Sequence, residues 1–180
     1  MWHIFSNRSP QVVVAATTAA LSVLEQQLLQ AVEQCYQLAE KHLQRSFPRP
    51  QVNFKLRGKA AGTAHLQLNK LRFHPVLLRE NPDAFIREVV PHEICHLLCY
   101  QLYGKVKPHG AEWKQLMQQI FHLPGKTTHQ FDTTSVTPKG KRYHCACGDI
   151  ELTLRRHNKI VRGQARYRCR SCGQWLQPAA

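Results

Sequence analysis

The stretch PHEICHLLCY, residues 91–100, carries the pattern that decides how the middle of the chain folds. Two histidines stand four residues apart, and Glu93 directly follows the first of them. On a helix, His92 and His96 lie one turn apart on the same face, so both imidazoles can reach one ion. Glu93 lies about 100° further round the helix, beside a water on that ion. The pattern HExxH therefore predicts a hydrolytic zinc site on a helix.

A histidine-rich piece of core is the alternative interpretation, since the chain has 11 histidines, and a third ligand is needed to decide. Cys99 lies on the histidine face, but it follows His92 by seven residues, about 10 Å along a straight helix, which is too far for one tetrahedral ion. Cys95 and Cys99 are therefore expected to be core thiols. Cys99 and Leu102 also occupy the glycine and histidine positions of HExxHxxGxxH enzymes, which excludes that class.

Two candidates for the third ligand follow in KPHGAEWK, residues 107–114. His109 is flanked by Pro108 and Gly110, so a loop can present its ring to an ion held by the preceding helix. Glu112 lies early in the next helix. It could be a metal ligand, a hydrogen-bond partner of a ligating histidine, or an acid that is favoured there only by the helix dipole. We prefer His109 as the third ligand and keep Glu112 as the alternative.

Apolar periodicity predicts an α+β fold for the main domain. The first expected element is a helix over 21–43, whose buried face carries Leu24, Leu28, Ala31, Cys35 and Leu38. A short antiparallel meander follows, with strands near 52–56, 64–68 and 71–73. A second helix starts at Asn81 and Pro82, includes PHEICHLLCY and stops near Gly104, and a third covers 111–121. Pro91 lacks an N–H, so it either kinks the ligand-bearing helix or opens a new one.

The chain divides into a main domain at 1–123, a linker rich in Thr, Lys, Gly and Pro at 124–142, and a cysteine module at 143–180. Residues 12–24 faintly resemble a signal peptide, but two threonines interrupt the run and no clean cleavage pattern ends it. That run is also too short to span a bilayer, so we expect no membrane contact. Seven cysteines, several in tight pairs, favour metal binding in a reducing compartment, which predicts a cytoplasmic protein.

The cysteine module contains two knuckles, YHCACG and YRCRSCG. Cys169 and Cys172 have the CxxC spacing at which two thiolates grip one zinc ion. The first knuckle has CxC rather than CxxC, one residue fewer between its cysteines. If Cys145 and Cys147 are the ligands, the site has four cysteines. If His144 and Cys147 are the ligands, the spacing of three residues is kept and the site has one histidine and three cysteines. Either site is closed, and its role is structural or recognitive rather than catalytic.

Between the knuckles, the alternating patterns at 150–154 and 165–169 predict a zinc-ribbon hairpin with its turn at His157, Asn158 and Lys159. The second strand would present cations on its outer face, near Tyr143, Tyr167 and Trp175. The expected nucleic-acid contacts are Arg155, Arg156, Arg162, Arg166, Arg168 and Arg170. The formal net charge of +14 also favours an acidic partner, although a solvated basic surface would give the same composition.

The segment NPDAFIREVVPHEICHLLCYQLYGKVKPHGAEWKQLM, residues 81–117, resembles the SprT family of zinc metallopeptidase-like proteins, in which HExxH is followed by a histidine in an HGxxW/F context. The cysteine module is also typical of the bacterial members, and the resemblance extends from about residue 50 onward. It implies a zincin-like catalytic domain, with His92, His96 and His109 as zinc ligands and Glu93 as the catalytic acid and base. It also favours Cys145 over His144, because related bacterial proteins carry CxC there.

Two functions of different classes are therefore expected. The first is a zinc metalloendopeptidase with one catalytic and one structural zinc ion, brought to DNA or DNA-bound proteins by its basic surface. The resemblance supports it, since the eukaryotic relative Spartan is a DNA-dependent protease that acts on proteins crosslinked to DNA. The second is a non-catalytic nucleic-acid-binding zinc protein, whose first site only holds the fold together. Glu93 discriminates between them, because a structural site needs no proton acceptor beside the ion.

Overall fold

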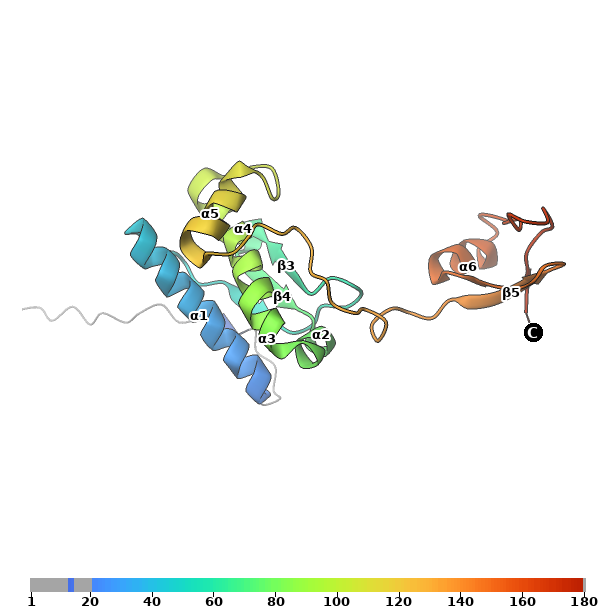
Figure 1. Cartoon of the computed structure of the whole chain (residues 1–180), viewed down its shortest axis with the longest axis horizontal. Coiled ribbons are helices and arrows are strands. Elements are labelled where there is room, and N and C mark those ends of the chain that lie inside the picture. The colour runs from blue at the N-terminus through green and yellow to red at the C-terminus, as the bar shows by residue number, and fades with distance from the viewer. Residues whose placement is uncertain (1–12, 15–20, 180) are drawn as a thin grey trace, which may run out of the picture. The chain divides into compact units, whose positions relative to one another are not determined.

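The computed structural model describes residues 13–14 and 21–179, which combine helices with small sheets and confirm the α+β expectation. These residues form two compact units that divide between Val136 and Thr137 (Figure 1). The run at 12–24 that resembles a signal peptide lies largely outside the described residues. Within the described ranges, no helix is both long enough and apolar enough to cross a membrane.

The first unit combines five α-helices, two single helical turns and a four-stranded sheet. Its α-helices are α1 (Val23–Leu43), α2 (Pro75–Glu80), α3 (Pro82–Ala84), α4 (Val90–Tyr103) and α5 (Ala111–Phe121). The single turns are the 3-10 turn η1 (Leu66–Leu68) and the π-helical turn η2 (Phe85–Val89). The strands are β1 (Val13–Val14), β2 (Gln51–Asn53), β3 (Gly62–His65) and β4 (Lys70–Phe73).

Helix α1 confirms the helix predicted over 21–43, and its start is fixed by a capping box. Ser22 Oγ accepts a hydrogen bond from the Glu25 N–H, and the Glu25 carboxylate accepts one from the Ser22 N–H at 2.8 Å. The helix ends at Gln44, whose backbone is left-handed. The buried face differs from the expected one at Leu38, which is exposed. The buried positions are Leu28, Ala31, Val32, Cys35, Tyr36 and Ala39.

The sheet has the strand order β1-β2-β4-β3, with β2 and β4 parallel and only β3 and β4 antiparallel. The predicted antiparallel meander is therefore wrong for β2. Val52, Leu71 and Phe73 are fully buried, as the alternation of apolar and polar residues predicts. Alternation fixes which face of a strand is buried, but it carries no information about which strand lies beside it. Although β3 precedes β4 in the chain, β4 lies beside β2 in the sheet, and β3 lies at the edge.

Helix α4 lies at the centre of the first unit, packed against α1, α5 and β3 (Figure 1). Ile94, Leu97 and Leu98 are fully buried in the core that these elements share. A ligand-bearing helix that is packed on several sides cannot rotate or shift without disrupting that core. Gly104 ends the helix, as predicted.

The π-helical turn η2 explains how Pro91 is accommodated. The N–H of Val90 reaches the carbonyl of Phe85, five residues back, so the turn before the proline is wider than an α-helical turn. Pro91 has no N–H to donate and its ring crowds the preceding turn, and the wider turn relieves this conflict. The chain therefore continues from α3 through η2 into α4, with Pro91 in the first turn of α4.

Part of the segment expected to be a linker packs on the first unit. The ring of Phe131 stacks on Phe85 with centroids 6.0 Å apart, and Val136 packs against the same core. Residues up to Val136 therefore belong to the first unit.

The second unit contains a three-stranded sheet of order β6-β5-β7 and one helix. Its elements are β5 (Lys141–Cys145), β6 (Gly148–Leu152), α6 (Leu154–Val161) and β7 (Gln177–Pro178). The hairpin is formed by β5 and β6, so the hairpin predicted between 150–154 and 165–169 is wrong. Its expected turn at 157–159 lies inside α6, because Leu154, His157 and Ile160 recur at helical rather than strand spacing.

Candidate metal centres

Three imidazoles meet at one point in the first unit. His92 and His96 lie one turn apart on α4, and His109 comes from the loop before α5. Their Nε2 atoms form a triangle with sides of 3.0 Å (His92 to His109), 3.1 Å (His96 to His109) and 3.2 Å (His92 to His96). Three nitrogens bound to one tetrahedral zinc ion lie about 3.3 Å from one another. The triangle thus has the size that one ion requires.

Hydrogen bonding among the three rings does not account for this arrangement. A neutral imidazole has one N–H and one lone pair, so three Nε2 atoms in a triangle cannot all find partners in each other. Burial lowers the pKa of His96 to about 3 and of His92 to about 4, with the neighbouring histidines adding to both shifts. Burial also lowers the pKa of His109. The rings are therefore neutral, with lone pairs converging, which is the form that binds a metal ion.

The loop that presents His109 holds that residue in an unusual backbone conformation. His109 has φ 56°, which a residue with a side chain rarely adopts, and Gly104 opens the loop with φ 71°. The Gly110 N–H donates to the Lys107 carbonyl at 2.9 Å, which tightens the turn before α5. Strain of this kind is concentrated at functional sites, because the surrounding structure fixes the side chain in place.

Trp113 forms the wall behind all three histidines. Its ring centroid lies 4.8 Å from that of His92, 5.4 Å from that of His96 and 4.7 Å from that of His109. Its Nε1–H donates to the backbone carbonyl of His92 at 3.4 Å, and only 1% of the residue is exposed. The sequence pattern placed Trp113 on the inward face of a helix, but it gave no sign of contact with every candidate ligand.

Glu93 is almost completely buried beside the histidines, with 7% of the residue exposed. Burial raises the pKa of its carboxyl to about 8, against a weaker opposing effect of a backbone hydrogen bond with Ala64 in β3. Glu93 has no ion-pair partner among the described residues. A carboxyl that accepts a proton near neutral pH is suited to acid and base chemistry.

Glu93 and the three histidines line a cleft with a volume of about 560 Å³. One wall is the edge strand β3 with the residues before it, and the other is the segment that follows α5. The remaining contributors include Leu66, Glu88, Val89, Pro108 and Met117. Most of these side chains are apolar, and the few polar groups converge near the histidines, as in a ligand-binding site.

The other candidates from the same stretch lie outside this site. The group of residues that could hold a metal ion consists of His92, His96 and His109 and does not include Glu112. Cys95 and Cys99 are buried in the core, as expected, and the Cys95 thiol donates to the Trp113 carbonyl at 3.3 Å. Burial raises the pKa of Cys95, while its hydrogen bond lowers the pKa of Cys99.

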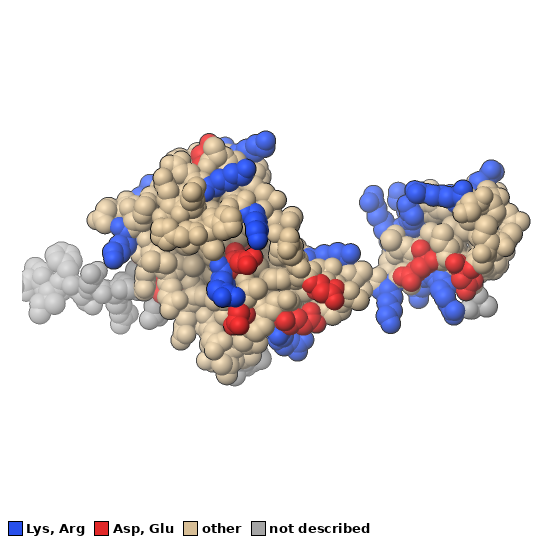
Figure 2. Space-filling model, in the orientation of Figure 1, with Lys and Arg blue, Asp and Glu red and all other residues tan. Residues whose placement is uncertain are grey.

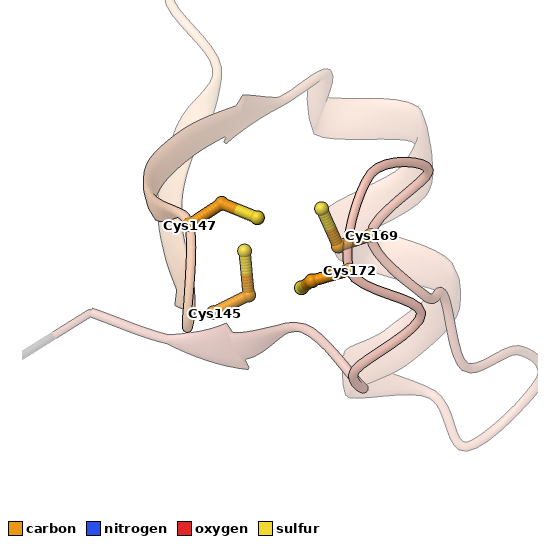
Figure 3. A group of neighbouring side chains, drawn as sticks. All are labelled: Cys145, Cys147, Cys169 and Cys172. Carbon is orange, nitrogen blue, oxygen red and sulfur yellow. The ribbon is translucent and has the colours of Figure 1, made fainter.

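The second unit brings four thiols together. Cys145 ends β5, Cys147 lies in the turn before β6, and Cys169 and Cys172 come from the second knuckle (Figure 3). Their sulfur atoms all lie within 4.8 Å of one another, so the group could hold a metal ion. Hydrogen bonds from backbone groups of Cys172 and Ser171 and from the Cys145 thiol lower the pKa of Cys169 to about 6. His144 does not belong to this group.

Cations dominate the surface of the second unit, which carries ten Lys and Arg residues and two acidic residues (Figure 2). The six arginines singled out from the sequence are all exposed. They do not form one stripe on a strand, because Arg155 and Arg156 lie on α6. The guanidinium groups of Arg166 and Arg168 lie over the ring of Trp175, at 4.5 and 4.2 Å from its centroid. Arg156 lies over Tyr167 at 5.6 Å.

Comparison with known proteins matches residues 32–132 to the SprT-like family. Protein SprT of Shewanella oneidensis is 58% identical over 149 residues, which cover 83% of this chain and 96% of that protein. Protein SprT of Vibrio parahaemolyticus is 50% identical over 147 residues, 82% of this chain and 89% of the relative. Protein SprT of Yersinia pestis is 49% identical over 154 residues, 86% and 91% of the two chains. No solved structure matches this chain.

Proposed function

The chain belongs to the SprT-like family, and from that premise we propose that it is a zinc-dependent metallopeptidase whose first unit is a zincin-like catalytic domain. The observation that carries the proposal is the buried Glu93 carboxyl beside three converging imidazoles in one cleft. A purely structural metal site would need the three ligands and a fourth, but no buried carboxyl without an ion-pair partner.

Zinc is the ion that best suits this set of ligands. Three neutral imidazoles with no thiolate fit a catalytic site, in which three protein ligands leave one position open. Zinc held there would lower the pKa of a bound water molecule to about 7 and polarise the carbonyl of a peptide bond.

Glu93 moves the proton during hydrolysis. Its carboxylate accepts a proton from the attacking water and donates it to the amide nitrogen of the leaving chain as the C–N bond breaks. The products are a carboxylate and an amine, so one water molecule accounts for all atoms. Trp113 and the packed helix α4 keep the histidine rings fixed while this happens.

The edge position of β3 supports a polypeptide substrate. Within the described residues, β3 pairs with a strand on one side only, and Gly62, Thr63 and Ala64 line the cleft. An extended peptide can add to such an edge through backbone hydrogen bonds, with little dependence on its sequence. A peptide placed along β3 passes Glu93, which contacts the same strand.

The second unit suits recruitment to DNA. We propose that the four cysteines hold a structural zinc ion and that the exposed arginines contact phosphates, which brings the catalytic unit to DNA-bound or DNA-crosslinked proteins. Thiolate ligands and free cysteines also suit a cytoplasmic protein.

The test compares the zinc-loaded chain with Glu93→Gln on a protein crosslinked to DNA and on the same protein free. We expect wild type to cleave the crosslinked protein and Glu93→Gln to be inactive while it keeps its zinc, because the amide accepts no proton. Unchanged cleavage by Glu93→Gln would overturn the assigned role. Absence of cleavage by wild type, together with DNA binding that Glu93→Gln preserves, would instead support the non-catalytic nucleic-acid-binding function.

A further inference from the structure

The segment Leu123–Phe131, which we call the strap, forms the cleft wall that faces β3. It follows α5 in Figure 1 and is held at both ends. At its start, the Leu123 N–H donates to the Met117 carbonyl at 3.1 Å, and at its end Phe131 stacks on Phe85. The residues between these anchors line the cleft, namely Pro124, Lys126, Thr127, Thr128 and His129.

The strap contacts one of the candidate metal ligands directly. Lys126 and His92 line the same cleft, and the Lys126 backbone raises the pKa of His92, as a carbonyl oxygen beside the ring does. Since Nε2 of His92 faces the other two histidines, Nδ1 is the ring nitrogen that is left to donate to this carbonyl. A partner of this kind fixes both the tautomer and the orientation of a metal-binding histidine. The position of the strap therefore affects the direction in which the Nε2 lone pair of His92 points toward an ion.

His129 fastens the strap near its C-terminal end. Its Nε2 lies 3.1 Å from the Lys59 carbonyl oxygen, and its Nδ1 accepts from the Phe131 N–H at 3.3 Å. A carbonyl only accepts and an amide N–H only donates, so both contacts require the Nε2–H tautomer. The ring also stacks on Phe131 at 4.7 Å between centroids. With both nitrogens engaged, His129 is free neither to bind an ion nor to transfer a proton in this arrangement.

The contact with Lys59 joins the two walls of the cleft. Lys59 precedes β3 by three residues, and β3 is the strand that lies against Glu93. The hydrogen bond from His129 thus links the wall that orients His92 to the wall that holds Glu93.

We propose that His129 is a positioning residue that latches the strap to the loop before β3 and thereby orients His92 for metal binding. The inference rests on the proposed function, since it requires that the three histidines hold zinc. It concerns His129 as a residue that acts through the Lys126 carbonyl, not as a fourth ligand.

The test measures zinc affinity of the full chain, by competition between the metal-free protein and a chromophoric zinc chelator. His96→Ala should bind one zinc ion fewer than wild type, and the ion that it loses is the one bound at the histidine site. We expect His129→Phe, which keeps the ring stack but loses both hydrogen bonds, to weaken zinc binding at the histidine site about tenfold. His129→Gln can donate to Lys59 and accept from Phe131, so it should remain within about threefold of wild type.

His122→Asn is the matched control, because it removes an exposed histidine next to the strap and retains a side chain that tolerates the left-handed backbone there. Its zinc affinity should equal that of wild type. Wild-type affinity in His129→Phe, or equal losses in His129→Phe and His129→Gln, would overturn the latch. If His129→Phe does not fold, His129→Leu takes its place against His129→Gln. A wild-type chain that holds no zinc sensitive to His96→Ala would refute the proposed metal site itself, which is a different result.

Discussion

Gly62 lies directly against Glu93. A methyl group at Gly62 would come within 2.6 Å of Glu93 Cγ and 2.9 Å of Oε1, closer than carbon and oxygen atoms can pack. The edge strand therefore approaches the carboxyl as closely as a glycine permits. This approach contributes to the burial of Glu93, and both residues line the cleft.

Gly62→Ala should displace the Glu93 carboxyl and lower kcat of the proposed peptidase about 10- to 100-fold, because a shift of about 1 Å in a catalytic group has this effect. The three atoms nearest to the added methyl group all belong to Glu93, so zinc content should stay at the wild-type level. Peptidase kinetics and metal analysis of the same preparation check both statements. A variant with normal kcat would show that the close contact does not position Glu93.

Trp113→Leu should weaken zinc binding at the histidine site about tenfold and lower the free energy of unfolding of the first unit by about 2–4 kcal/mol. The indole supports all three imidazoles and is almost fully buried, so the smaller side chain leaves a cavity behind them. Trp113→Phe should lose less, because it keeps one aromatic ring in the wall, although it removes the second ring of the indole and the Nε1–H bond to His92. Zinc competition and denaturation monitored by circular dichroism measure the two effects separately.

Glu112→Gln and His109→Ala separate the two candidates for the third ligand. His109 belongs to the histidine group and Glu112 does not, so His109→Ala should lose the zinc bound by the first unit. Glu112→Gln should retain it with an affinity close to wild type. Metal content after dialysis distinguishes the variants, and loss of zinc from Glu112→Gln would contradict this assignment.

Local pattern was sufficient for much of the site. HExxH fixed His92, Glu93 and His96 on one helix, and the flanking Pro108 and Gly110 indicated that His109 is presented from a loop. These inferences depend on neighbours in sequence, where helix geometry determines which side chains share a face.

Contacts between distant segments could not be read in the same way. The approach of Gly62 to Glu93 depends on which strand lies at the sheet edge, and alternation does not reveal that order. The composition of the strap predicts a linker, yet Lys126 and His129 line the cleft. The polar residues at 157–159 have the composition of a turn, yet they lie inside α6, because helical spacing of Leu154, His157 and Ile160 prevails there.

Cys169→Ser should remove the zinc of the second unit and unfold that unit, since a closed four-ligand site contributes its binding free energy to folding. His144→Ala should keep this zinc, because His144 is not part of the thiol group. The two units have separate cores, so the histidine site of Cys169→Ser should still bind zinc. Metal content and amide-resolved NMR of both variants test these statements, and loss of zinc from His144→Ala would favour the three-cysteine alternative.

Arg49→Met should destabilise the first unit by about 3 kcal/mol, because the buried guanidinium pairs with Glu33 at 2.8 Å and Glu40 at 2.6 Å and lies 4.9 Å from the centroid of Tyr36. Arg49 holds the pKa of Glu40 below its usual range. The stability that this ion pair contributes is therefore fully present above the pKa of Glu40 in the unfolded chain, about 4.5. It is lost as the pH falls through the lower pKa that Glu40 has in the folded chain. Urea unfolding of the metal-free chain, followed at 222 nm between pH 7 and pH 3, should show a smaller acid dependence in Arg49→Met than in wild type. Arg45→Met, which removes an exposed cation, should leave that dependence unchanged.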